Sequence, residues 1–274
     1  MLTDAALIIL GLAGLTFSAM LVRAAMYEPR AGKPAALAEA AASECPEGAE
    51  ERLSGALMAR TVNLKGGAEP PSEELGRLHR HLRVSFPLCF ERMQVSCHND
   101  HSLLMRWTGS EAGLDPVLMM GHLDVVPVEE STMGQWKHGP FSGDIEEGFI
   151  WGRGALDCKN VVLGLLEAAE ALLKEGFIPK RTLLFAFGHD EETGGMYGAA
   201  SVADALRREG ARLHMILDEG GRVDSPGSFT GCAREAIISV AEKGYASFKL
   251  EVDVPGGHSS RPSKVNAPAL LIRA

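Results

Sequence analysis

The chain has 274 residues, with 27 Lys or Arg against 36 Asp or Glu, so its formal net charge is −9. This length suits one large domain, or one domain and part of a second. Because no stripe of basic side chains occurs, the sequence argues against a protein that binds the phosphate backbone of nucleic acids. Hydrophobic residues make up 46% and charged residues 23%, which is typical of a folded globular protein.

The cysteines argue against a disulfide framework or a structural zinc knuckle, because their number is odd and no CxxC pair occurs. A single bridge between Cys89 and Cys97 stays open at this point. The five are Cys45, Cys89, Cys97, Cys158 and Cys232.

An uncharged apolar run of about 18 residues, 5–22, lies near the N-terminus and is barely long enough to span a bilayer. Three interpretations stay open: a retained membrane anchor, a cleaved signal peptide and a buried helix. No Lys or Arg precedes the run, which counts against a signal peptide. We expect residues 1–27 to be membrane-directed, so that the protein is anchored or secreted. The side of the membrane stays open, since the nearby basic residues follow the run.

An Ala-, Pro- and Glu-rich linker is expected over residues 28–47, before the main body of the chain. Beyond it, apolar spacing alternates between the helical period and short, continuous apolar runs. The expected elements are helices at 50–62 and 72–84, a strand at 102–108, a buried strand at 116–123, a helix at 160–175, a buried strand at 181–188, a helix at 195–209 and a buried strand at 213–217. This alternation predicts an α/β fold, with a mainly parallel sheet and helices on both faces.

The pattern changes near the C-terminus. Residues 245–254 alternate apolar and polar side chains, which predicts a half-exposed antiparallel strand, and a helix is expected to begin at Ala267. We therefore expect a main domain over 48–242, followed over 243–274 by the truncated start of a second domain.

Polar residues gather where the predicted strands end, and there the sheets of α/β proteins bind their ligands. His122 and Asp124 stand two residues apart at the end of one strand, so both face one side. Asp157 follows two glycines, and acidic groups follow the next two strands, in HDEETGG and in LDEGG. Each has an ordinary alternative: a structural histidine, a helix N-cap, a solvated acidic turn or a loop acid.

Taken together, one imidazole and several carboxylates form the ligand set that zinc, cobalt or manganese accepts. The four successive ionisable residues at 189–192 have no Lys or Arg among them and would repel one another, and a cation would relieve that repulsion. Two metal ions about 3.5–4 Å apart are a common arrangement for hydrolysis by an activated water. The sequence therefore indicates a metal site at the strand ends.

Four ordered segments then resemble a known family, the carboxypeptidase S and aminoacylase group of dinuclear zinc peptidases. They are GHLDVVPV, WKHGPFSGDIEEGFIWGRGALDCK, FGHDEETGG and LDEGG. The resemblance implies two Zn²⁺ ions per site, with Co²⁺ or Mn²⁺ as alternatives. It implies that His122 and Asp218 bind one ion, that Glu192 binds the other and that Asp157 bridges both.

The resemblance also implies roles for residues that bind no metal. Glu191 would be the general base on the metal-bridging water, and Asp124 the partner that orients His122. His258, in GGHSS, would reach the substrate of a partner subunit in a homodimer. The family's remaining histidine ligand has no counterpart before the chain ends at Ala274. The resemblance implies that 48–242 is a catalytic metallopeptidase domain and that 243–274 is the truncated start of an α+β lid or dimerisation domain.

The implied reaction is hydrolysis of an amide bond next to a free carboxylate, in a small peptide or an N-acyl amino acid. Two alternatives stay open. One is a related zinc aminopeptidase, against which the GGHSS segment argues. The other is a truncated, inactive fragment that retains partial metal binding.

Overall fold

The computed structural model divides the chain into two compact units, Met1–Glu50 and Glu51–Ala274. In the first unit, α1 (Leu2–Ala25) makes the apolar run helical. None of the helices among the described residues is long and apolar enough to cross a membrane, so the structure gives the expected membrane segment no support. The structure describes residues 2–26, 45–64, 70–225, 233–241, 244, 246–254 and 266–273.

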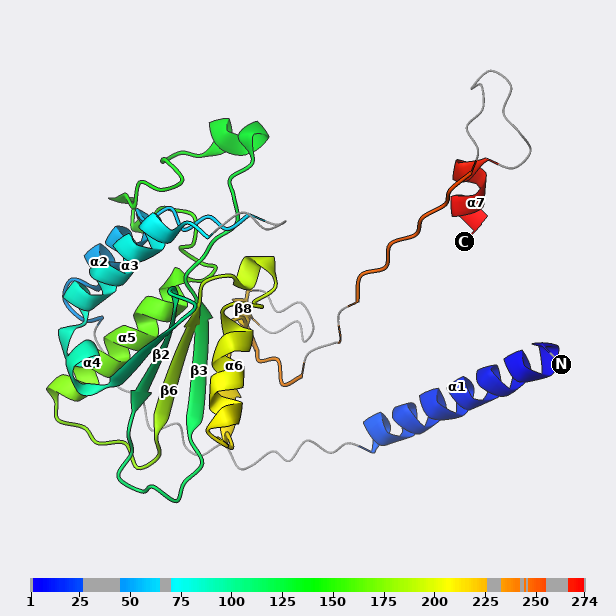
Figure 1. Ribbon diagram of the computed structural model, residues 1–274, viewed down its shortest axis with the longest axis horizontal. Helices are drawn as coiled ribbons and strands as arrows, with labels where there is room; N and C mark the ends of the chain where they lie inside the picture. The colour runs from blue at the N-terminus through cyan, green and yellow to red at the C-terminus, as the bar shows by residue number, and fades with distance from the viewer. Residues whose placement is uncertain are drawn as a thin grey trace. The chain divides into compact units, whose positions relative to one another are not determined.

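A sheet of five strands, in the order β1-β2-β6-β3-β7, forms the centre of the second unit (Figure 1). Strands β3, β6 and β7 are parallel, whereas β2 is antiparallel to both β1 and β6. Four of the five strands thus point in one direction, which confirms the predicted mostly parallel sheet. The strands are β1 (Gln94–His98), β2 (Ser102–Trp107), β3 (Val117–His122), β6 (Leu183–Gly188) and β7 (Met215–Leu217).

Helices cover both faces of the sheet, as predicted: α2, α3, α4 and α5 lie on one side and α6 on the other (Figure 1). In α5 the buried residues Val162, Leu166 and Leu173 recur at helical spacing and face the sheet. The helices are α2 (Ala49–Leu57), α3 (Ser72–Ser85), α4 (Pro87–Arg92), α5 (Lys159–Lys174) and α6 (Ala199–Arg208).

Successive residues of the central strands fill two separate cores. Met105 and Phe187 pack with the helices on the α5 side. Leu104 and Leu184 lie an odd number of residues from Met105 and Phe187 along the same strands, and they pack on the α6 side with Val202. This division follows from the two-residue period of a strand, whose side chains point alternately to opposite faces. Both faces are apolar, which explains why the central strands read as nearly continuous apolar runs.

Strand β7 corrects one expectation, because the sequence predicted a buried strand at this position. Met215, Ile216 and Leu217 are 50%, 55% and 52% exposed. Within the described part of the chain, β7 pairs only with β3 and lies at the edge of the sheet. An edge strand lacks a neighbour on one side, so its apolar side chains remain accessible to water.

Two further expectations differ from the structure. Residues 246–254, which fall within the predicted strand at 245–254, form no strand, since no other described segment pairs with them. Cys89 and Cys97 are both free thiols, so the bridge left open by the sequence is not formed.

The remaining elements are short. Helix α7 begins at Ala267 as predicted, whereas α4 and β1 were not predicted at all. These remaining short elements are the 3₁₀ helices η1 (Glu130–Gln135) and η2 (Glu191–Thr193), the strand pair β4 (Ile145–Glu146) and β5 (Phe149–Ile150), the strand pair β8 (Arg222–Asp224) and β9 (Glu235–Ile237), and α7 (Ala267–Arg273).

Leu166 on α5 is fully buried, whereas Leu156 is 88% exposed, so these two leucines offer a matched test of the core. Leu166→Ala should lower the free energy of unfolding by about 2–5 kcal/mol, because it removes buried methyl groups and leaves a cavity. Leu156→Ala should change it by about 0.5 kcal/mol or less. Urea denaturation measures both changes. Similar losses in the two variants would contradict the packing of α5 against the sheet.

Candidate metal centre

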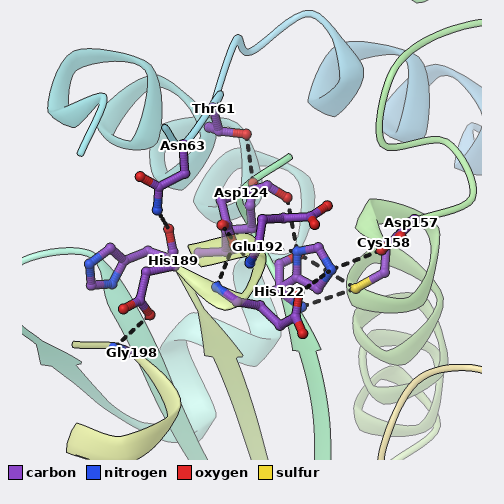
Figure 2. A network of polar contacts seen from close by, with 12 residues as sticks. Thr61, Asn63, His122, Asp124, Asp157, Cys158, His189, Glu192 and Gly198 are labelled. Atoms are coloured by element: carbon purple, nitrogen blue, oxygen red, sulfur yellow. Dashed lines mark hydrogen bonds and ion pairs between the residues drawn. The ribbon is translucent and has the colours of Figure 1, made fainter. Parts of the chain in front are cut away.

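The parallel pairing of β3 with β6 brings two of the sequence motifs side by side. His122, at the end of β3, is paired with Gly188, at the end of β6. The next main-chain N–H, of Leu123, donates to the carbonyl of Gly188 at 2.7 Å. The acidic turn that follows Gly188 therefore begins beside His122 and Asp124, as Figure 2 shows.

His122 lies at the bottom of the site, with its side chain only 2% exposed. Its Nδ1 lies 2.9 Å from the main-chain carbonyl of Asp124. Because a carbonyl only accepts hydrogen bonds, Nδ1 carries the hydrogen and Nε2 faces the site, the arrangement that suits a metal-binding imidazole. Nε2 lies 2.9 Å from Asp157 Oδ1, 3.9 Å from Glu191 Oε2 and 3.5 Å from Glu219 Oε1.

Asp124 is fully buried and holds three groups at once. Its Oδ1 accepts a hydrogen bond from the main-chain N–H of Glu191 at 3.1 Å, and its Oδ2 accepts one from Glu192 at 3.2 Å. Its Oδ1 also lies 3.3 Å from Nδ1 of His122. One carboxylate thus fixes the backbone of both glutamates and the imidazole that they face.

Asp157 extends into the site from the segment before α5. The alternative of a helix N-cap does not hold, because Cys158 is the N-cap residue and Asp157 contacts His122 instead. The Asp157 side chain is 72% exposed, and a cis peptide bond joins it to Cys158. Burial raises the pKa of the Cys158 thiol to about 11, and its sulfur accepts a hydrogen bond from the main-chain N–H of His122 at 3.1 Å.

Hydrogen bonds that the sequence did not reveal brace the turn after β6. Ser102, at the start of the antiparallel strand β2, lies 2.7 Å from Nδ1 of His189. The side-chain amide of Asn63 donates to the carbonyl of His189 at 3.1 Å. Asp190 accepts hydrogen bonds from the main-chain N–H groups of Tyr197 and Gly198, both at 2.8 Å. Ser102 and Asn63 lie 87 and 126 residues from His189 in the sequence, so no local pattern identified these two contacts.

Two overlapping groups of side chains meet the geometry of a metal site among the described residues. The potential ligand atoms of each group lie within 4.8 Å of one another. The first group is His122, Asp157, Cys158 and Glu219, and the second is His122, Glu191 and Glu192. Imidazole with carboxylates is a donor set that zinc accepts, so the chemistry of these residues fits the implied metal.

Glu219 belongs to the first of these groups, whereas Asp218, to which the resemblance gives a metal-binding role, belongs to neither. The carboxylate of Asp218 is exposed and accepts a hydrogen bond from the main-chain N–H of Glu219 at 2.9 Å. Oε2 of Glu219 is buried and has no hydrogen-bond partner among the described residues. Both residues line a cavity of about 270 Å³ together with His122 and Glu191. The role of Asp218 stays a prediction, and Glu219 is a candidate that the sequence analysis missed.

The site is strongly anionic. Burial lowers the pKa of His122, but its hydrogen bonds and negative neighbours, Asp124 and Glu219 among them, outweigh burial and raise it to about 12. Burial raises the pKa of Glu191 and Glu192, helped by the carboxylates around them and opposed by His122. Like charges at this density favour a cation in the site.

His258 lies outside the described residues, so its contribution to a partner's site and the expected homodimer stay predictions.

Asp218 and Glu219 are neighbours at the end of an edge strand, so only one of them is expected to bind the metal. The side-chain positions favour Glu219. Glu219→Gln should therefore lower Zn²⁺ affinity at least tenfold, and Asp218→Asn should change it less than twofold. Calorimetric titration of both variants and the wild type measures the affinities. The reverse result would mean that β7 presents Asp218 to the site, and large losses in both would contradict the single-ligand expectation.

Residues 118–274 match peptidase family M20/M25/M40. Carboxypeptidase S of Saccharomyces cerevisiae is 38% identical over 224 residues, which cover 77% of this chain and 38% of the relative. An N-fatty-acyl-amino acid synthase/hydrolase of Danio rerio is 39% identical over 196 residues, covering 70% and 38%. The Mus musculus protein of that name is 37% identical over 228 residues, covering 82% and 44%.

The chain thus spans less than half the length of these curated relatives. The family match, however, includes the end of β3 with His122 and runs through the acidic segments after β6 and β7. On this match, the chain belongs to peptidase family M20/M25/M40.

Proposed function

We propose that this chain carries the metal-binding site of a hydrolase that cleaves an amide bond next to a free carboxylate. The substrate is a small peptide or an N-acyl amino acid. The observation that carries the proposal is the convergence of His122, Asp157, Glu191 and Glu192 at the strand ends. The relatives named carboxypeptidase S and N-fatty-acyl-amino acid synthase/hydrolase support the two substrate classes.

His122, Asp157 and Glu192 would hold a pair of Zn²⁺ ions, with either Asp218 or Glu219 as a further ligand. When bound, the metal polarises the substrate carbonyl and lowers the pKa of a water molecule. Glu191 is the best-placed base, since its side chain is 55% exposed and lines the cavity beside His122. Its raised pKa brings the carboxylate closer to the neutral range in which a general base works best.

Glu191 takes a proton from the attacking water and passes it to the departing amine, so one carboxylate serves both steps. Asp124 keeps this carboxylate in place through the main-chain N–H of Glu191. Because the same side chain also holds Glu192, the base and its neighbouring ligand stay at a fixed spacing.

The substrate class is tested by hydrolysis assays of the chain with added Zn²⁺. We expect cleavage of N-acyl amino acids or dipeptides that have a free carboxylate, loss of cleavage with a chelator, and recovery when Zn²⁺ is restored. The carboxamide-blocked version of the same substrate should react much more slowly. Preferential release of amino-terminal residues from blocked peptides would indicate an aminopeptidase, and Zn²⁺ binding without any hydrolysis would indicate an inactive, metal-binding chain.

The two neighbouring glutamates are expected to separate proton transfer from metal binding. Glu191→Gln should lower turnover by at least 10²-fold with little change in metal content, because only the base is removed. Glu192→Gln should lower metal content, because it removes an anionic ligand. Metal analysis beside steady-state kinetics distinguishes the two effects. Equal loss of metal in both variants would contradict this division of roles.

A further inference from the structure

Lys159 is a fully buried lysine to which the proposed reaction gives no role. A buried amino group is unfavourable unless it forms hydrogen bonds. Its Nζ donates to the main-chain carbonyls of Ala56 at 3.0 Å and Ala59 at 2.7 Å. Burial lowers the pKa of Lys159 to about 7. Both the charged and the neutral amine have N–H groups, so these two hydrogen bonds form in either state.

Ala56 lies in the last turn of α2, which finishes at Leu57, and Ala59 lies two residues beyond the helix. Each carbonyl also accepts a local main-chain hydrogen bond, Ala56 from Ala59 at 3.3 Å and Ala59 from Thr61 at 3.0 Å. Lys159, the first residue of α5, adds a second donor to each carbonyl from a distant part of the chain. Its side chain therefore ties the end of α2 to the beginning of α5.

The same residue closes the loop that presents Asp157. The main-chain N–H of Lys159 donates to the carbonyl of Gly154 at 2.9 Å. The lysine stem packs against Gly154, where an added Cβ would lie 3.3 Å from the lysine Cδ. Asp157 stands inside this closed loop, exposed, and contacts His122. The position of its carboxylate thus depends on the loop, and the loop depends on Lys159.

We propose that Lys159 is a positioning residue, which sets the metal affinity of the site by anchoring the 154–159 loop to the end of α2 and so holding Asp157 opposite His122. The inference rests on the proposed function in one respect, since it takes Asp157 and His122 as metal ligands.

A second tie between the same two helices provides the control. Arg52 of α2 forms a bidentate ion pair with Glu167 of α5, at 2.5 and 2.7 Å. This pair joins α2 to α5 as Lys159 does, but Glu167 lies two turns further along α5, away from the Asp157 loop. Arg52→Met therefore loosens the contact between the helices without removing the anchor of the loop.

The test measures Co²⁺ binding to the 274-residue chain by its visible absorption, with urea denaturation of each protein. Lys159→Met should lower Co²⁺ affinity by about 10–100-fold, the usual effect of losing a group that supports a metal ligand. Arg52→Met should lose stability but change Co²⁺ affinity less than twofold. Wild-type affinity in a folded Lys159→Met chain would overturn the proposal, and so would equal affinity losses in the two variants.

A double-mutant cycle shows whether Lys159 acts through Asp157. In an Asp157→Asn background, Lys159→Met should cause no further loss of affinity, whereas a full additional loss would overturn the proposed route. If Lys159→Met does not fold, Lys159→Gln retains a donor and should still bind Co²⁺ at least threefold more weakly than the wild type. Wild-type affinity in Lys159→Gln would overturn the proposal. A wild-type chain that binds no Co²⁺ would instead refute the metal site, and the function proposed from it.

Discussion

The buried carboxylate of Asp124 is the contact on which the rest of the site depends. It accepts hydrogen bonds from two successive main-chain N–H groups, those of Glu191 and Glu192, and it lies against the imidazole of His122. Hydrogen bonds to an ionised carboxylate are stronger than those between neutral groups. Without these donors, the buried carboxylate would lack hydrogen bonds, which would lower the stability of the fold. The turn after β6 is therefore held where its N–H groups can donate to Asp124. The hydrogen bonds of Asp124 therefore set the spacing between His122 and the two glutamates.

The pattern of side chains predicted much of the sheet. Apolar runs located β3 and β6, and helical spacing located α3 and α5, because these segments bury one or both faces against the same core. The exposure of Met215 and its neighbours in β7 was not predictable in this way. Composition tells whether a strand suits burial, whereas the presence of a covering neighbour depends on segments far away in the chain.

The residues of the site likewise fall into those that the sequence predicted and those that it did not. Adjacent motifs at strand ends were sufficient to place His122, Asp124, Glu191 and Glu192 together, since parallel strands bring their ends to one edge. Asp157 reaches the same site from the loop before α5. The choice between Asp218 and Glu219 is finer than a motif resolves, because both residues follow the end of β7, where the strand's regular alternation no longer fixes which side chain faces the site. The bracing by Ser102 and Asn63 left no sequence signal, since each joins segments that only the fold brings into contact.

The residues that position this site and the residues proposed to carry its chemistry differ in their exposure to solvent. Asp124 and Lys159, which hold other groups in place, are fully buried, whereas the side chains of Asp157 and Glu191 are 72% and 55% exposed. A buried group with satisfied hydrogen bonds has few alternative positions. Such groups therefore hold the exposed carboxylates in defined positions. The exposed carboxylates repel one another, and His122 and the surrounding water offset part of that repulsion. The scaffold therefore maintains a cluster of charges that is unfavourable alone and becomes favourable when a cation binds, and this is the physical reason to propose a metal site here.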